Sequence, residues 1–183
     1  MIRLMDFSHA RLAFESSRLT LRIMEDHDAT PEYAGWLNDP EVNRYLATKS
    51  ATIQELQDYI RKKDLQVDAL FFGVYLKENN AHIGTVKLEP IEPDQKRATI
   101  AVMIGDKASW GKGYAAEAMQ LLMDWCFNEL GFDEVNLGVI AKNAAAIRAY
   151  EKLGFVEMKR ELAYVQYGDE MHDHVLMAVK RRP

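Results

Sequence analysis

Two spacings of apolar residues divide the chain into stretches typical of strands and stretches typical of helices. Alternation of apolar and polar residues predicts strands, whereas apolar residues every three to four positions predict helices. The expected strands are residues 18–24, 69–77, 82–91, 97–105, 134–141, 155–167 and 171–179. The expected helices are residues 27–47, interrupted at Pro40, and residues 52–64, 114–130 and 143–154.

The order of these elements predicts an α/β fold with a mixed, largely antiparallel sheet. Short polar links at 78–81 and 92–96 connect three consecutive strand-like stretches in the manner of hairpins. A helix, a strand, a helix and two final strands follow, which is not a repeated parallel pattern. The 183 residues contain no internal repeat and no linker-like tract, so we expect a single domain over 1–183.

Charge and cysteine content narrow the class of partner and the compartment. The formal net charge of −5 lacks the basic excess that phosphate backbones require, so we expect no nucleic-acid partner. The single cysteine, Cys126, excludes an internal disulfide and suits a reducing compartment. Residues 1–17 lack the apolar run of a signal peptide, and no stretch is apolar enough to span a membrane. We therefore expect a cytoplasmic protein without a membrane partner.

The segment SWGKGYAAEAM, residues 109–119, places two glycines between a predicted strand and a long predicted helix. The first N–H groups of a helix lack intrahelical partners and carry a partial positive charge, so anions bind there. Gly111 and Gly113 allow a ligand to approach the backbone closely, and Lys112 adds a positive charge. The sequence therefore predicts a phosphate site at this loop.

Two common phosphate-binding motifs do not explain the loop. A Walker loop needs four residues between its first glycine and a Gly-Lys-Ser/Thr ending, but five residues separate Gly105 from Gly111 and a glycine follows Lys112. Gly111, Gly113 and Ala116 match the dinucleotide-binding fingerprint in form. That fingerprint belongs in a βαβ unit, whereas antiparallel strands are expected before this loop.

A third class of phosphate site is indicated by a resemblance. The stretch WGKGYAAEA, followed about 30 residues later by NAAAIRAYEKLGF, resembles the two motifs of the GNAT N-acetyltransferase family in order and spacing. The stretches SSRLTLR and WLNDPEVNRYL resemble the branch that acetylates the N-termini of ribosomal proteins. The likeness covers about residues 16–178 and implies the GNAT sheet, in which parted central strands form an acyl-CoA cleft.

The resemblance also implies the roles of individual residues. A freed backbone amide of Met103 or Ile104 would hold the thioester carbonyl, and Asn143 would bind coenzyme A. The Tyr150 hydroxyl would face the departing thiolate. Backbone amides of the loop would bind the pyrophosphate, and Trp110 stands where the family has Gln or Arg, so these amides must contribute more. The loop residues concerned are Gly111, Lys112, Gly113, Tyr114 and Ala115.

The general base is less clearly marked in the sequence. Glu89 and His82 are candidates on the strand expected at 82–91, and we take Glu89 as the predicted catalytic carboxylate. The two are seven residues apart, so strict alternation puts them on opposite faces and at most one can serve. His172 and His174 share one side of a strand without a third ligand at suitable spacing, so no metal is expected.

These expectations define an enzyme that transfers an acetyl group from acetyl-CoA, its co-substrate, to a primary amine by direct attack. The acceptor is open among a protein N-terminus, a polyamine, an amino sugar and another small amine such as an antibiotic, and a homodimer is also open. The alternative is a catalytically inactive module that binds coenzyme A as a sensor or interaction partner. The presence of Tyr150 favours the enzyme.

Overall fold

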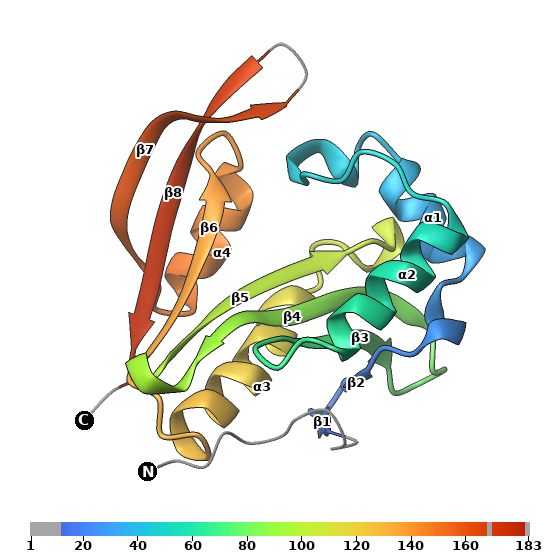
Figure 1. Ribbon diagram of the computed structural model, residues 1–183, viewed down its shortest axis with the longest axis horizontal. Helices are drawn as coiled ribbons and strands as arrows, with labels where there is room; N and C mark the ends of the chain where they lie inside the picture. The colour runs from blue at the N-terminus through green and yellow to red at the C-terminus, as the bar shows by residue number, and fades with distance from the viewer. Residues whose placement is uncertain (1–11, 168–169, 182–183) are drawn as a thin grey trace.

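The computed structural model describes residues 12–167 and 170–181, and this part of the chain forms one eight-stranded sheet. The strands lie in the order β1-β2-β3-β4-β5-β6-β8-β7, and only β5 and β6 pair in parallel (Figure 1). Their bounds are β1 Ala13–Glu15, β2 Leu19–Ile23, β3 Leu70–Leu76, β4 His82–Glu92, β5 Arg97–Ile104, β6 Glu134–Ile140, β7 Val156–Tyr167 and β8 Glu170–Lys180. The expected mixed, largely antiparallel sheet is confirmed.

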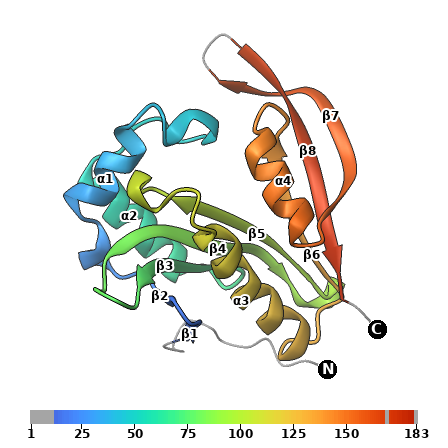
Figure 2. The same cartoon turned by 180° about the vertical axis from the view of Figure 1, so that it is seen from behind.

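Helices cover both faces of this sheet. The helices are α1 Pro31–Asn38, α2 Ile53–Asp64, α3 Tyr114–Asn128 and α4 Ala144–Lys152. One face carries α1 and α2, and the other carries α3 and α4 (Figures 1 and 2). Among the described residues, no helix is long and apolar enough to cross a membrane.

Local sequence signals account for where α1 and α2 begin. Thr52 begins α2 with a capping box, in which its hydroxyl accepts from the Glu55 N–H and the Glu55 carboxylate accepts from the Thr52 N–H. Thr30 caps α1 ahead of Pro31, whose fixed φ suits the first helical position. The helix expected over 27–47 is therefore shorter than predicted, because Pro31 begins it and only 3-10 turns flank α1.

The amino-terminal part of the chain differs from expectation in one element. The short strand β1, which pairs with β2 at the edge of the sheet, was not predicted, because three residues are too few to show a periodicity. The absence of a signal peptide was predicted from residues 1–17. Of these, residues 1–11 lie outside the described part of the chain.

The larger core lies between the sheet and α3. The buried residues of α3 are Ala118, Met119, Leu122, Met123 and Cys126. The apolar spacing also predicts Ala115 and Trp125 on this face, but both are only partly buried, and Met123 is an addition. Burial raises the pKa of the Cys126 thiol to about 12, which leaves it protonated and unreactive at neutral pH. As predicted, Cys126 is a small core residue.

The pairing between β5 and β6 is short. Only the pairs Arg97–Glu134, Ala98–Val135 and Thr99–Asn136 form, although β5 continues to Ile104 and β6 continues to Ile140. Beyond these pairs the two strands diverge, and the sheet opens as a V (Figures 1 and 2). The expected parting of the central strands is therefore present.

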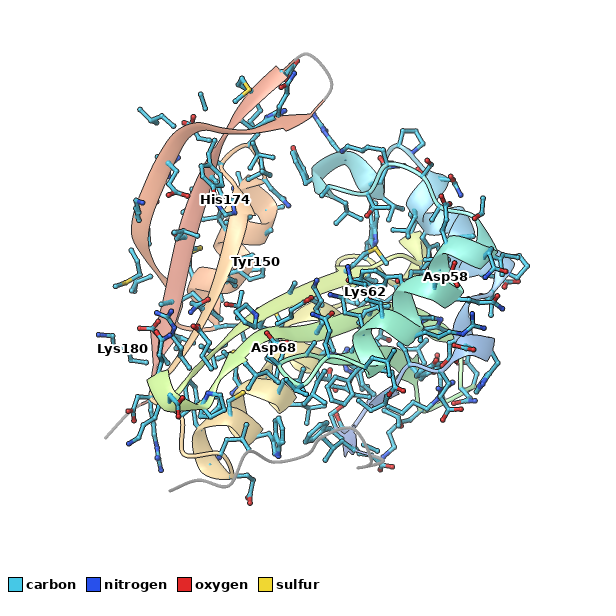
Figure 3. The ribbon with its side chains drawn as sticks, viewed as in Figure 1. Asp58, Lys62, Asp68, Tyr150, His174 and Lys180 are labelled. Atoms are coloured by element: carbon cyan, nitrogen blue, oxygen red, sulfur yellow. The ribbon has the colours of Figure 1, made fainter. Side chains whose placement is uncertain are left out.

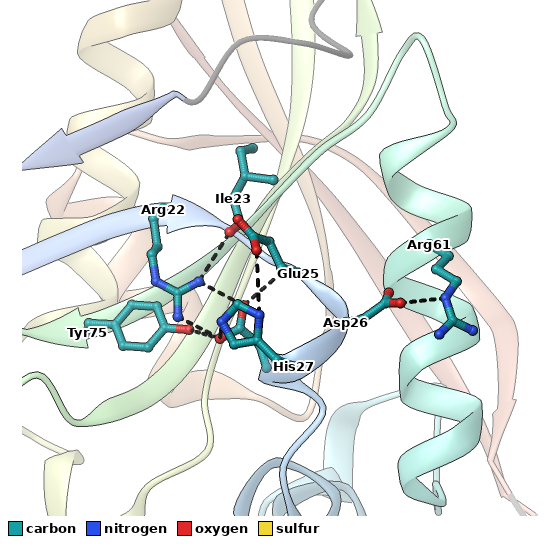
Figure 4. A network of polar contacts seen from close by, with 8 residues as sticks. Arg22, Ile23, Glu25, Asp26, His27, Arg61 and Tyr75 are labelled. Carbon is teal, nitrogen blue, oxygen red and sulfur yellow. Dashed lines mark hydrogen bonds and ion pairs between the residues drawn. The ribbon is translucent and has the colours of Figure 1, made fainter.

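A buried ion pair anchors the segment that leads into α1. The Asp28 carboxylate accepts from the Arg22 guanidinium at 2.8 and 2.6 Å, from the Tyr75 hydroxyl at 2.8 Å and from the Glu25 N–H at 2.8 Å (Figure 4). Burial opposes ionisation of Asp28, but these hydrogen bonds outweigh it and lower its pKa. Nearby, Asp26 bonds Arg61 at 2.6 Å in an exposed pair.

We expect Asp28→Asn to lower the free energy of unfolding by about 2–4 kcal/mol at pH 7, because it removes a buried charge and leaves its donors imperfectly paired. The matched variant Asp26→Asn, in an exposed pair, should cost less than about 1 kcal/mol. Urea denaturation of both variants checks this. Because the pKa of Asp28 is lowered in the folded state, the difference in free energy of unfolding between the parent and Asp28→Asn should shrink as pH falls below about 4. Equal costs for the two variants would contradict the anchoring role.

Candidate active site

The opening between β5 and β6 contains a cleft of about 620 Å³. It is lined by the end of β5, the glycine loop, the first turn of α3 and one face of α4. The residues predicted for the coenzyme that line it are Ile104, Trp110, Gly111, Gly113, Tyr114, Ala115, Asn143 and Tyr150. Met103 lines a neighbouring pocket instead, and Lys112 is exposed outside both sets of lining residues.

The glycine loop presents unpaired backbone donors to this cleft. Gly111 and Gly113 have φ values of 73° and 82°, a left-handed conformation that favours glycine. Gly113 is the N-cap of α3, and it has no side chain with which to satisfy the first N–H groups of the helix. A Cβ added at Gly111 would meet no atom within 4 Å, so the backbone there is open to a ligand. The arrangement suits a phosphate group.

Arg18 at the start of β2 braces the loop from the side. Its Nε donates to the Glu117 carboxylate at 2.7 Å, and one terminal nitrogen donates to the Lys112 carbonyl at 3.0 Å. The guanidinium also lies 4.6 Å from the centre of the Tyr114 ring. These partners are about a hundred residues from Arg18 in the sequence, so no local pattern could have indicated them. Arg18 thereby fixes both the loop and the first turn of α3.

The alternation of hydrogen bonds along β5 indicates which amide faces the cleft. The Gly105 N–H donates to the Ile83 carbonyl at 2.9 Å, and β4 and β5 remain in one register from Gly84–Ile104 to Leu88–Ile100. Alternate residues of an antiparallel strand direct their N–H groups to the same neighbour, so the Met103 N–H faces β4. The Ile104 N–H faces the side that β6 has left. Of the two amides expected, Ile104 is the one directed into the cleft.

The indole of Trp110 contributes to the end of β5. Its Nε1 donates to the Ile104 carbonyl at 2.7 Å, which satisfies a carbonyl that β6 no longer pairs with. The side chain that replaces the family's Gln or Arg therefore supports the strand rather than reaching toward a phosphate. The expectation that the backbone amides contribute more to binding stays a prediction.

Two predicted side chains of α4 face the cleft. The Asn143 side-chain oxygen caps α4 by accepting from the Ala146 N–H at 3.3 Å, and the amide NH₂ remains available as a donor. Tyr150 lies seven residues further on, where Figure 3 shows it between α4 and the opened strands. Burial raises the pKa of Tyr150, so its hydroxyl stays protonated at neutral pH and can donate.

A second pocket, of about 410 Å³, lies on the opposite face of the sheet between α1, α2 and the ends of β4 and β5. Val102 lines both this pocket and the cleft. The two spaces therefore adjoin at a part of β5 that no longer pairs with β6. This second pocket is called the acceptor pocket below.

A contact between loops also links the two halves of the structure. The Tyr45 hydroxyl, in the 3-10 turn Asn43–Tyr45, donates to the Lys142 carbonyl at 3.3 Å. Lys142 directly precedes Asn143, so this contact joins the segment between α1 and α2 to the start of α4. It lies at the open end of the V.

The expectation that His82 and Glu89 lie on opposite faces is wrong. A register shift between β3 and β4, next to Tyr75 and His82, interrupts the alternation. The His82 ring packs on Tyr33 and Trp36 of α1, at 5.8 and 5.0 Å between centroids, and Glu89 binds α2 on the same face.

Neither candidate base is placed for proton abstraction in the acceptor pocket. The His82 Nε2 lies 2.9 Å from the Gly84 carbonyl, and the ring is not among the lining residues. Glu89 forms ion pairs with Lys63 and with Lys87, the second at 2.8 Å. Burial opposes its ionisation, but the two ammonium groups outweigh it and lower the pKa of Glu89 to about 2. So weak a base argues against the predicted role, which stays untested.

The histidines of β8 lie away from both spaces. His174 packs over Gly138 of β6 and stacks on Tyr164 at 5.5 Å between ring centroids. Figure 3 shows it on β8, beyond α4. Within 12–167 and 170–181, no three His, Cys, Asp or Glu side chains are arranged to hold a metal ion.

Comparison with known proteins places this cleft in a family. The model of the acetyltransferase (GNAT) domain matches residues 18–156, so the chain belongs to this family. It is 34% identical over 144 residues to the uncharacterized N-acetyltransferase p20 of Bacillus licheniformis, covering 76% of this chain and 80% of the relative. It is 29% identical to the probable N-acetyltransferase YjcK of Bacillus subtilis, covering 69% and 68%. The narrower branch of ribosomal-protein acetyltransferases stays a prediction.

Solved structures share the fold. A spermidine N-acetyltransferase from Vibrio cholerae, solved in complex with CoA and spermine, superposes with a TM-score of 0.81 at 24% identity, over 90% of this chain and 96% of that one. A probable acetyltransferase superposes with a TM-score of 0.82 at 18% identity, over 94% and 98%. At these identities the likeness shows the GNAT architecture alone.

We expect Ala145→Trp to abolish the rise in melting temperature that acetyl-CoA causes, because the exposed Ala145 lines the cleft and an indole would occupy it. The neighbouring Ala144→Trp is the matched control, since Ala144 is also exposed but does not line the cleft. Differential scanning fluorimetry with and without acetyl-CoA measures both. An undiminished shift in Ala145→Trp would show that the coenzyme binds elsewhere.

Proposed function

We propose that this protein transfers an acetyl group from acetyl-CoA to a primary amine by direct attack on the thioester. The observation that carries the proposal is that the cleft and the acceptor pocket share Val102 in their linings, where β5 no longer pairs with β6. A ligand in each space would bring its reactive end to the same short stretch of backbone. Proximity of this kind favours transfer in one step, without a covalent enzyme intermediate.

The cleft has groups suited to each part of coenzyme A. The amides from Gly111 to Ala115 at the start of α3 suit the pyrophosphate, and the Asn143 amide suits the polar groups of the pantetheine arm. The complex of the Vibrio cholerae structure with CoA adds support from a protein of the same fold. Acetyl-CoA is a co-substrate here, and the proposal includes no metal.

The proposed transfer forms one bond and breaks another, and two groups of the protein assist these steps. The amine nitrogen attacks the thioester carbon, and the carbonyl oxygen gains negative charge that the Ile104 N–H can stabilise, an effect typically worth about 3–4 kcal/mol. Collapse then expels the coenzyme A thiolate, toward which the Tyr150 hydroxyl donates a hydrogen bond. The proton lost by the attacking nitrogen passes to solvent.

Tyr150 suits a hydrogen bond better than a complete proton transfer. An unperturbed phenol has a pKa about 1.5 units above that of a thiol, and burial raises the pKa of Tyr150 further. Donation of the proton to the thiolate is therefore uphill, whereas a hydrogen bond to the developing charge is available throughout. The catalytic contribution is electrostatic.

The lining of the acceptor pocket supplies no clear general base, so the attacking amine would lose its proton to solvent. Glu55 is the one carboxylate among its lining residues, and its Oε2 accepts from the N–H and hydroxyl of Thr52. The pKa of Glu89 is far below neutrality. An amine of pKa near 8 loses its proton readily, whereas one near 10.4 requires about 4–5 kcal/mol at pH 7. A strongly basic acceptor should therefore be acetylated faster as pH rises toward its pKa.

The experiment that tests the function measures release of coenzyme A thiol from acetyl-CoA with a panel of amines. The panel contains a peptide with a free N-terminus, spermidine, an amino sugar and simple alkyl amines. Acetylation of an amine, confirmed by mass, supports the enzyme. Binding of acetyl-CoA with no transfer to any amine would instead favour the inactive binding module.

We expect Tyr150→Phe to lower kcat about 100-fold with little change in the KM for acetyl-CoA, because the hydroxyl acts on the charge that develops in the transition state. Steady-state kinetics with an accepted amine gives both constants. Tyr164→Phe on β7, exposed and outside both lining sets, serves as the matched control. Unfolding free energy should stay within about 1 kcal/mol of the parent. An unchanged kcat, where chemistry limits turnover, would leave Tyr150 only a packing role.

A further inference from the structure

The acceptor pocket is mainly apolar, and few of its lining groups carry charge. Its walls include Leu37, Leu46, Leu56, Phe71, Val102 and Met103. The charged residues among its lining are Glu55 and Lys87. An acceptor with several positive charges would find one carboxylate and one ammonium group there, which is a poor match for a polycation.

Lys87 belongs to a cluster with an excess of positive charge. Its Nζ donates to Glu89 Oε2 at 2.8 Å and to the Tyr59 hydroxyl at 3.2 Å. The other oxygen of Glu89 is bonded by Lys63, whose side chain is 9% exposed, so two ammonium groups share one carboxylate. Of these two cations Lys87 alone lines the pocket, and its side chain is 30% exposed.

The ammonium group of Lys87 has a donor left for a ligand. It carries three N–H bonds, of which Glu89 and Tyr59 accept two. Burial works against its charge, but the hydrogen bonds and the electrostatic attraction of Glu89 and Tyr59 together outweigh burial and raise the pKa of Lys87. The group is therefore fully protonated at neutral pH, and it faces a pocket whose other walls are largely apolar.

Resting on the proposed function, we propose that the acceptor is a primary amine with an apolar body and a remote carboxylate, which Lys87 binds with its third N–H donor. The amine end would lie past Val102, beside the Ile104 N–H, at the junction with the cleft. The apolar body would occupy the space between α2 and the strands. Glu55, at the start of α2, is held by its capping box and would not contact the carboxylate.

The register of the strands gives the spacing between the two ends of the acceptor. Lys87 pairs with Ala101, and Ile104, whose N–H faces the cleft, lies three residues further along β5. Three residues of extended strand span roughly 10 Å. The Lys87 side chain bonds Glu89, which lies farther still from the Ile104 end, so the carboxylate must stand well away from the amine. An α-amino acid is too short to join the two positions.

Three amines of one length test the proposal. 8-Aminooctanoate, octylamine and 1,8-diaminooctane share an eight-carbon chain and differ in the remote group, which is a carboxylate, a methyl or a second ammonium. We expect kcat/KM to fall in that order, with 8-aminooctanoate exceeding octylamine about tenfold or more, as a hydrogen bond between charged groups would give. Acetylation is followed by thiol release and by product mass.

Lys87→Met should bring the ratio of kcat/KM for 8-aminooctanoate and octylamine close to one. Lys62→Met, an equal change at an exposed position of α2 (Figure 3), should keep the parental ratio. Both kcat/KM values of a ratio are measured with the same variant, so a lower concentration of folded enzyme affects them equally and does not change the ratio. Melting temperatures with acetyl-CoA verify that both variants still bind the coenzyme.

The outcomes separate this inference from the proposed function. Preference of the parent for 1,8-diaminooctane, or a ratio unchanged by Lys87→Met, would overturn the remote carboxylate while leaving acetyl transfer in place. Failure of every amine to be acetylated, despite binding of acetyl-CoA, would overturn the proposed function and this inference with it.

Discussion

The end of pairing between β5 and β6 after Thr99 and Asn136 is the constraint on which the rest of the structure depends. Backbone N–H and C=O groups inside a protein need partners, so a strand that loses its neighbour requires other groups to satisfy it. Trp110 supplies a donor for the Ile104 carbonyl. The N–H groups directed to the same side are left for a ligand, which makes the gap in the sheet a binding site.

Elements on both faces of the sheet serve this gap. On one face the start of α3 and the side of α4 form the cleft, and Arg18 holds the glycine loop in place from β2. On the other face α1 and α2 form the acceptor pocket, and the Asp28 ion pair anchors the chain that enters α1. The two spaces thus open on different faces of the sheet and share a boundary at Val102.

The order of strands and helices and the glycine loop could be predicted from local patterns, whereas the cleft between parted strands was implied by the resemblance to the GNAT family. Alternating residues marked the strands, and the glycines at 111 and 113 marked the turn into α3. The cluster of Lys63, Lys87 and Glu89 was not predicted, since its members come from α2 and β4 and nothing in the local pattern joins them. The faces of His82 and Glu89 were mispredicted because a bulge interrupts the alternation, and sequence alone does not locate bulges.

The contact between Tyr45 and Lys142 has a mechanical consequence. Beyond its last pair with β6, at Thr99, β5 continues for roughly 17 Å to Ile104 without pairing with β6. If β5 and β6 rotated relative to each other by about 0.1 radian about this pair, their far ends would separate by roughly 1.7 Å. A hydrogen bond of 3.3 Å does not tolerate such a displacement. The hydrogen bond from Tyr45 to Lys142 therefore forms only over a narrow range of separations between the two sides of the V.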